Sequence, residues 1–244
     1  MDSAIYNAAS GMIVQQIRLD VTANNLANIN TPGFQRDGIF VRELVRFTDA
    51  DGRFSSSVNG TVVVPATFTT ERTATPVRTG DPTDLVLFGP GLFAVETRHG
   101  VRYTRNGSFS RDDQGYLVNG RGDRMLGQDG PLKLPRGDFS VQEDGTISVA
   151  GNKIGRLRLV EIPTSQRVRE GEGMFLPNRA SALKPAGNST RVQQGFREGS
   201  AVRPMEEMVE LITAQRAFQT YERVMQLIVN EVDRRAVSDI AGPA

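Results

Sequence analysis

The two ends of the chain carry apolar positions at the spacing of long helices. Residues 3–28 contain no proline and a single glycine, and apolar side chains recur every seven residues, at Ile5, Met12, Leu19 and Leu26. This spacing is typical of a helix that packs along one seam, with a slight left-handed supercoil around its partner. The following Thr31-Pro32-Gly33 combines the restriction before proline with a glycine breaker, which predicts that the helix ends near Asn28.

The C-terminal segment has the same pattern over a longer stretch. Pro204 suits a first helical position, and two glutamates follow it at the positive end of the helix dipole. From there to Arg235 the chain has no further proline and no glycine. Leu211, Phe218, Met225 and Val232 fall every seven residues, with Met208 in an interleaved series. The pattern predicts a helix about 45–48 Å long, at 1.5 Å per residue.

Between the two ends, the pattern changes to that of β-strands. Residues 156–162 alternate polar and apolar side chains, as expected for a sheet with one solvent-exposed face. Hairpin signals such as Asn119-Gly120, Asp129-Gly130 and Asp144-Gly145 separate the candidate strands. The strands are expected at residues 61–69, 84–88, 92–97, 101–105, 116–118, 139–142, 146–149 and 156–162. The fold class is therefore α+β, with a central, mainly antiparallel β domain.

These patterns predict four regions. Residues 1–30 and 204–244 form a terminal helical assembly domain, 31–60 an irregular or extended connection, 61–176 the central β domain, and 177–203 a return connection. Neither terminal helix is stable without packing, so we expect the two to pair as a coiled-coil-like domain. Periodicity alone also allows a hairpin that only covers the β body. Contacts with other copies are the alternative, and head-to-tail contacts that do not close generate helical assemblies.

Composition excludes several classes of function. The formal net charge is +1, without the basic excess that nucleic-acid binding usually leaves. The chain has no cysteine, which removes disulfides, thiolate metal sites and a cysteine nucleophile. Its apolar runs span a few residues, against roughly 20 for a membrane helix, so no membrane insertion is expected. The first residues have no basic region followed by a long apolar stretch, which argues against a cleaved signal peptide.

The sequence contains no convincing active site. His99 is the single histidine and lies in an expected turn, with no cysteine or second histidine to complete a common zinc site. The acidic segments 49–52 and 112–115 do not fill a twelve-position calcium loop and are read as polar turns. We therefore expect no catalytic residues, no metal, no cofactor and no small-molecule substrate.

One segment has a specific resemblance. Ala23-Asn24-Asn25-Leu26-Ala27-Asn28-Ile29-Asn30-Thr31-Pro32-Gly33-Phe34 closely resembles the N-terminal signature of the flagellar rod and hook protein family. Residues 205–218 are similar to the closing helix of that family, and residues 91–95, 103–109 and 113–118 resemble its β-domain motifs. The resemblance covers essentially the whole chain. Amides such as Asn24, Asn25 and Asn28 near a helix end most often cap or cross-link backbone.

The resemblance implies a structural subunit of the flagellar basal-body rod. Such proteins leave the cell through the flagellar type III export apparatus without a cleaved signal. In the periplasm they assemble helically with themselves and related rod subunits, and they transmit torque from motor to hook. The assembly interface is then expected at Ile5, Met12, Leu19, Leu26, Met208, Leu211, Phe218, Met225 and Val232.

Within the family, the start of the chain and its modest length resemble the proximal-rod member. A distal-rod or hook-type subunit is the alternative, and a phage-tail-like structural component is a further one. A third hypothesis is an enzyme or cell-wall-binding module that uses the β body, which the missing catalytic constellation disfavours.

Overall fold

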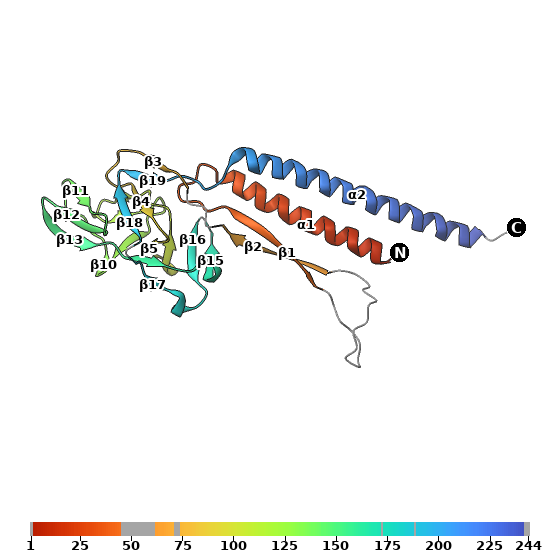
Figure 1. Ribbon diagram of the computed structural model, residues 1–244, viewed down its shortest axis with the longest axis horizontal. Helices are drawn as coiled ribbons and strands as arrows, with labels where there is room; N and C mark the ends of the chain where they lie inside the picture. Colours follow the sequence, from red (N-terminus) through yellow and green to blue (C-terminus); the bar gives the residue numbers. More distant parts are fainter. Residues whose placement is uncertain (1, 45–61, 71–73, 172, 188, 242–244) are drawn as a thin grey trace. The chain divides into compact units, whose positions relative to one another are not determined.

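The structure is a computed structural model that describes residues 2–44, 62–70, 74–171, 173–187 and 189–241. It divides the chain into two compact units. The first unit contains residues 1–27, 37–69 and 203–244, and the second contains residues 28–36 and 70–202. The first therefore joins the two ends of the chain, and the second is the β body. Figure 1 follows the chain through both.

Two α-helices belong to the first unit. Helix α1 spans Asp2–Ala27 and helix α2 spans Pro204–Ala241. The prediction that the first helix ends near Asn28 is confirmed, because α1 ends at Ala27. Helix α2 begins at the expected proline, with Glu206 and Glu207 in its first turn, and continues beyond Arg235. Within the described residues, neither helix is long and apolar enough to cross a membrane.

The first unit also contains a pair of antiparallel strands, β1 (Asp37–Leu44) and β2 (Val62–Thr69). They pair from Asp37↔Thr69 to Leu44↔Val62. Strand β1 lies in the segment that the sequence assigned to an irregular or extended connection. Residues 48–60 of that segment, and Thr61 at the start of the expected strand 61–69, lie outside the described residues.

The second unit consists of short strands. Their bounds are β3 Pro76–Arg78, β4 Leu85–Phe88, β5 Leu92–Thr97, β6 Gly100–Thr104, β7 Ser110–Arg111, β8 Leu117–Val118, β9 Arg124–Gly127, β10 Gly130–Pro131, β11 Phe139–Val141, β12 Thr146–Val149, β13 Asn152–Arg156, β14 Leu159–Glu161, β15 Arg167–Glu170, β16 Met174–Pro177, β17 Lys184–Pro185, β18 Arg191–Gln194 and β19 Phe196–Glu198. Two 3-10 helices, at Thr164–Gln166 and Ala180–Ala182, complete it.

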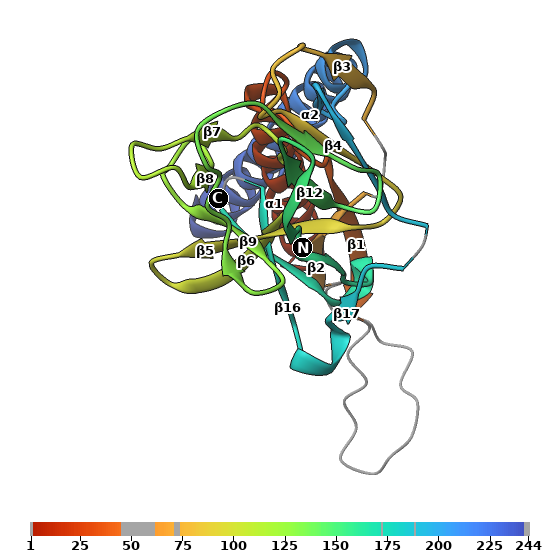
Figure 2. The same ribbon diagram turned by 90° about the vertical axis from the view of Figure 1, so that its left-hand side faces the viewer.

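The largest sheet of the β body has the order β15-β16-β6-β5-β9-β8-β7, and these neighbouring strands pair antiparallel. Figure 2 shows β5, β6 and β16 of this sheet. Strand β5 is central and is buried on both faces. Phe93 and Val95 belong to one hydrophobic cluster, and Leu92 and Ala94 belong to a second. Because both faces are covered, the strand reads as a continuous apolar run rather than an alternating one. Phe93 also meets Phe109 edge to face, with ring centroids 5.5 Å apart.

The expected β-rich, mainly antiparallel centre is confirmed, and each of the eight expected segments contains a strand. The β body extends further than expected, because β17, β18 and β19 lie in residues 177–203, which were assigned to a return connection. Strand β18 pairs with β4, and β19 pairs with β3. The return segment is therefore part of the β body.

Candidate assembly surface

Helices α1 and α2 lie side by side and run antiparallel (Figure 1). At one end of their overlap, Asn25 of α1 contacts Glu207 of α2. Four helical turns away, a Cβ added to Gly11 would meet the ring of Tyr221 at 2.5 Å. The single glycine of α1 therefore lets the tyrosine ring approach the helix backbone.

The family motif residue Asn25 ties three elements of the first unit together. Its Nδ2 donates to the backbone oxygen of Asp37 at 2.9 Å and to Glu207 Oε2 at 3.1 Å. Its Oδ1 accepts the Asp37 backbone N–H at 2.9 Å. Both side chains of the Asn25–Glu207 contact are buried, with 1% and 0% exposure. The expected cross-linking of backbone is thus found at Asn25, and it joins α1, α2 and the start of β1.

The predicted seam residues are not the ones that make these two contacts between the helices, but Met12, Leu26 and Met208 lie next to them in the sequence. Most of them are half-buried in the chain, namely Ile5, Met12, Leu19, Leu26, Leu211, Phe218 and Met225. Met208 is 46% exposed. The side chain of Val232 lies outside the described residues. Their role as contacts between subunits remains a prediction.

Both helices expose large apolar side chains. On α1 these are Tyr6 and Ile13, and on α2 they are Met205, Met208, Val209, Ile212, Val224, Leu227 and Val229. We call this set the apolar helix surface. Leu227 is 69% exposed and Met205 is 73% exposed. Among them, Met205, Met208, Val209 and Ile212 follow the i, i+3, i+4, i+7 spacing of one helix face, and contiguous exposed apolar patches mark interaction sites.

The second half of the family motif forms a turn packed within the β body. The Thr31 hydroxyl donates to Asn28 Oδ1 at 3.1 Å, and the Phe34 N–H donates to the Thr31 oxygen at 3.2 Å. Gly33 has φ +66°, and a Cβ there would meet the Asn106 backbone nitrogen at 2.5 Å. Phe34 is buried beneath the Arg169 guanidinium, 4.7 Å from its ring centroid.

A buried ion pair lies next to this turn. Arg105 Nε is 2.8 Å from Glu198 Oε2, and the side chains are 4% and 2% exposed. Arg105 Nη1 donates to the backbone oxygens of Gly89 and Gly91, and its Nη2 donates to that of Leu87. Burial raises the pKa of Glu198, and the charge of Arg105 opposes that rise. The Gly33 N–H donates to the Glu198 backbone oxygen at 3.0 Å. This bond joins the motif turn to strand β19, which ends at Glu198.

These residues were only partly predictable. Arg105 belongs to a segment whose family resemblance was noted, but its partner Glu198 is 93 residues away. Glu207 was assigned to the helix dipole, and nothing local indicated its contact with Asn25. Gly11 carried a usable signal, because an isolated glycine inside a helical pattern often marks close packing.

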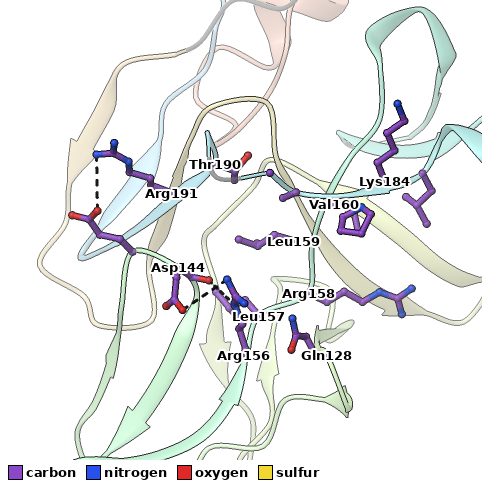
Figure 3. A pocket seen from close by; sticks show the side chains of 15 residues that line it. Gln128, Asp144, Arg156, Leu157, Arg158, Leu159, Val160, Lys184, Thr190 and Arg191 are labelled. Atoms are coloured by element: carbon purple, nitrogen blue, oxygen red, sulfur yellow. Dashed lines mark hydrogen bonds and ion pairs between the residues drawn. The ribbon is translucent and has the colours of Figure 1, made fainter.

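The β body also has an open groove of about 590 Å³ between β14, β17 and β18 (Figure 3). Leu159 lies in its centre. Two ion pairs border it: Arg156 with Asp144 at 3.8 Å, and Arg191 with Glu143 at 4.0 Å. Hydrogen bonds from the Thr146 backbone and hydroxyl lower the pKa of Asp144. The acidic side chains therefore complete local turns and ion pairs.

The single histidine, a candidate metal ligand, lies in a surface turn. His99 is exposed in the turn between β5 and β6, where its N–H donates to Thr97 Oγ1 at 3.2 Å. Among the described residues, no group of three or more histidine, aspartate or glutamate side chains is placed to hold a metal ion.

The two terminal helices pair with each other, expose apolar side chains, and lie before and after the β body in the sequence. This arrangement is typical of a structural subunit that assembles through its terminal helices. Three family models match successive parts of the chain. Residues 5–35 match the flagella basal body rod protein model, and residues 86–149 match the D1 domain of flagellar hook protein FlgE/F/G. Residues 193–236 match the C-terminal model of the flagellar basal body rod FlgEFG protein.

Whole-chain relatives agree with these matches. The chain is 31% identical to flagellar basal-body rod protein FlgF of Caulobacter vibrioides, over 97% of each chain. It is 32% identical to FlgF of Salmonella typhimurium, also over 97% of each chain. Its identity to rod protein FlgG of Bacillus subtilis is 30%, over 93% of this chain and 98% of the relative. The chain belongs to the flagellar basal-body rod protein family, and it is a structural subunit of the rod.

Proposed function

We propose that the terminal helices form a coiled-coil-like assembly domain through which the subunit contacts copies of itself and related rod proteins. The observation that supports this most is the apolar helix surface, because its exposed side chains lie on both helices of a pair that is already formed. The predicted seam residues lie in the same two helices and would extend the contact. In the rod, such a domain would help to transmit torque from motor to hook.

We also infer the route and the place of assembly. The subunit leaves the cell through the flagellar type III export apparatus without a cleaved signal and assembles in the periplasm. The proximal rod is the position we favour, because Met1-Asp2-Ser3-Ala4-Ile5-Tyr6 resembles the corresponding segment of the proximal-rod member. A distal-rod or hook-type position is the alternative.

We infer that the protein has no enzymatic activity and acts through its surfaces. The buried charged groups support this, since Arg105 bonds Glu198 and backbone oxygens. The groove around Leu159 is bordered by side chains already engaged in ion pairs.

A substitution at an exposed residue of α2 tests assembly without disturbing the fold. Leu227→Asp places a charge on the apolar helix surface, where the side chain is 69% exposed. The monomer should therefore keep its helical signal, while motility should fall to the level of a strain without the gene, because burying an unpaired charge in a contact is costly. The measurements are circular dichroism of the purified protein and swimming of the complemented strain.

The matched control is Gln226→Asp, one residue earlier in the same helix and also exposed. It should swim. If Leu227→Asp also swims, this part of α2 is not an interface, and the proposal fails there.

A further inference from the structure

Two contacts fix how far α1 and α2 are displaced along one another. Asn25 contacts Glu207 at one end of the overlap, and Gly11 faces Tyr221 at the other. The contacting residues are 14 apart in α1 (25 − 11) and 14 apart in α2 (221 − 207). Both contacts therefore belong to a single antiparallel register.

The apolar pattern does not choose this register. Leu19 and its equivalents recur every seven residues in α1, and Leu211 and its equivalents do the same in α2. Displacing one helix by seven residues moves each apolar series onto itself, so the two series keep the same relative positions. Hydrophobic burial is non-directional, so it leaves several registers close in free energy.

We infer that Asn25 and Glu207, which we call the register pair, specify the register of the terminal helices. Displacement by seven residues in one direction puts Asn25 opposite Ala214, which is fully buried and has no acceptor in its side chain. Displacement in the other direction moves Asn25 past the start of α2 at Pro204. Either change separates two buried polar groups, and a buried group left unsatisfied costs its full desolvation penalty. A single polar residue in a helix seam sets register in the same way.

The glycine contact favours the same register sterically. Tyr221 fits where α1 has no Cβ, since a Cβ on Gly11 would approach its ring to 2.5 Å. In the displacement that brings Asn25 to Ala214, Tyr221 would instead face Arg18. This role lies within one chain and goes beyond the proposed contacts between subunits.

Disulfide mapping on the full chain tests the inference, because the natural sequence has no cysteine. The native-register pair is Arg18→Cys with Ala214→Cys, seven residues from both observed contacts in each helix. The displaced-register pair is Thr22→Cys with Ala217→Cys, which face each other when Asn25 is opposite Ala214. A disulfide needs Cα atoms within about 7 Å, so only one of the two pairs can close in each register. Oxidation is scored on non-reducing gels of the monomer.

In the otherwise natural chain, the native-register pair should oxidise and the displaced pair should stay reduced. With Asn25→Leu and Glu207→Leu together, the disulfide of the displaced pair should increase by about tenfold, which is roughly what a lost hydrogen bond to a charged group allows. Glu207→Gln keeps an acceptor for the Asn25 amide, so it should preserve the native pattern.

The matched control is Asn24→Leu with Glu210→Leu, two neighbouring exposed positions, and it should keep the native pattern. Glu207→Leu alone, which leaves the Asn25–Asp37 bonds in place, is the second test variant. The inference is overturned if both test variants still oxidise only the native-register pair. It is also overturned if both lose their helical signal, since the pair would then determine folding rather than register.

Discussion

Gly33 shows at the scale of one residue why the family turn needs glycine. Its φ of +66° is disfavoured for residues with a Cβ, and the Asn106 backbone occupies the space that a Cβ would need. Gly80 has a similar φ of +76° but no atom within 4 Å of its added Cβ. A Cβ added at Gly80 would therefore meet backbone strain alone, whereas one added at Gly33 would meet both strain and steric overlap.

We predict that Gly33→Ala destabilises the protein more than Gly80→Ala. Strain alone should cost about 1–2 kcal/mol at Gly80, while overlap with backbone should add roughly 1–3 kcal/mol at Gly33. Urea unfolding of the two variants measures the difference. Equal losses would contradict the close packing of the motif turn.

The Arg105–Glu198 pair gives a second prediction. Arg105→Met leaves a buried carboxylate without its partner, which should cost about 3–5 kcal/mol of unfolding free energy. The control is Arg203→Met, which breaks the exposed pair with Glu206 and should cost less than about 1 kcal/mol. Comparable losses in the two variants would show that the buried pair contributes no more than a surface pair.

The cost of Arg105→Met should depend on pH. Burial raises the pKa of Glu198 in the folded protein, and removing Arg105 takes away the charge that opposes the rise. The folded state then binds the proton more tightly than the unfolded chain, so stability present at low pH is lost as pH rises through the folded pKa. Unfolding at pH 4 and pH 8 should show the larger loss at pH 8. A larger loss at pH 4 would contradict this sign.

At the scale of residues, the sequence indicated which side chains belong to family motifs, but not which residues they contact. Asn25 was recognisable as a motif amide, yet its contacts with Asp37 and Glu207 depend on segments 12 and 182 residues away. Arg105 was likewise visible without Glu198. Such pairings arise from tertiary packing, which a local pattern does not encode.

At the scale of elements, the helices were predictable because their signals are local. The turn after Asn28 and the proline at position 204 mark helix boundaries through backbone sterics alone. Strand β1 was missed because Gly38, Arg42 and Glu43 interrupt its apolar pattern. The strand Arg191–Gln194 was missed because only one of its residues is apolar, and that residue, Val192, is buried against the main core.

The orientation of the helices around their axes was less predictable. The seven-residue series containing Leu19 is apolar, whereas the contacts in the structure use Gly11 and Asn25, another series with the same spacing. A period of seven defines several parallel stripes on a helix. Small and hydrogen-bonding residues allow the closest approach, and apolar ones lie beside it.

We predict that Leu19→Asp or Leu211→Asp blocks rod assembly. Both residues are half-buried, and a charge placed there is costly without a partner. Soft-agar swimming of complemented strains measures the effect, and Gln215→Asp at an exposed position of α2 is the control. Normal swimming of either leucine variant would remove that residue from the interface.

At the scale of the whole molecule, one chain combines a unit made from its two ends with a β body made from its middle. Bringing the ends together places the apolar side chains of both helices in one unit, where they remain exposed in the single chain. Contacts with further subunits would bury them, and related rod proteins would offer similar surfaces. The family motifs hold each unit together: Asn25 in the first, and Gly33 with Arg105 in the second.

We propose that the terminal helices are the assembly element of a rod subunit. The most direct measurement uses a strain without the gene, complemented with either the full-length protein or a form lacking residues 3–28. Motility is scored, and basal bodies are examined by electron microscopy. Intact rods and swimming are expected only with the full-length protein. Intact rods with the shortened form, or normal swimming without the gene, would contradict this proposal.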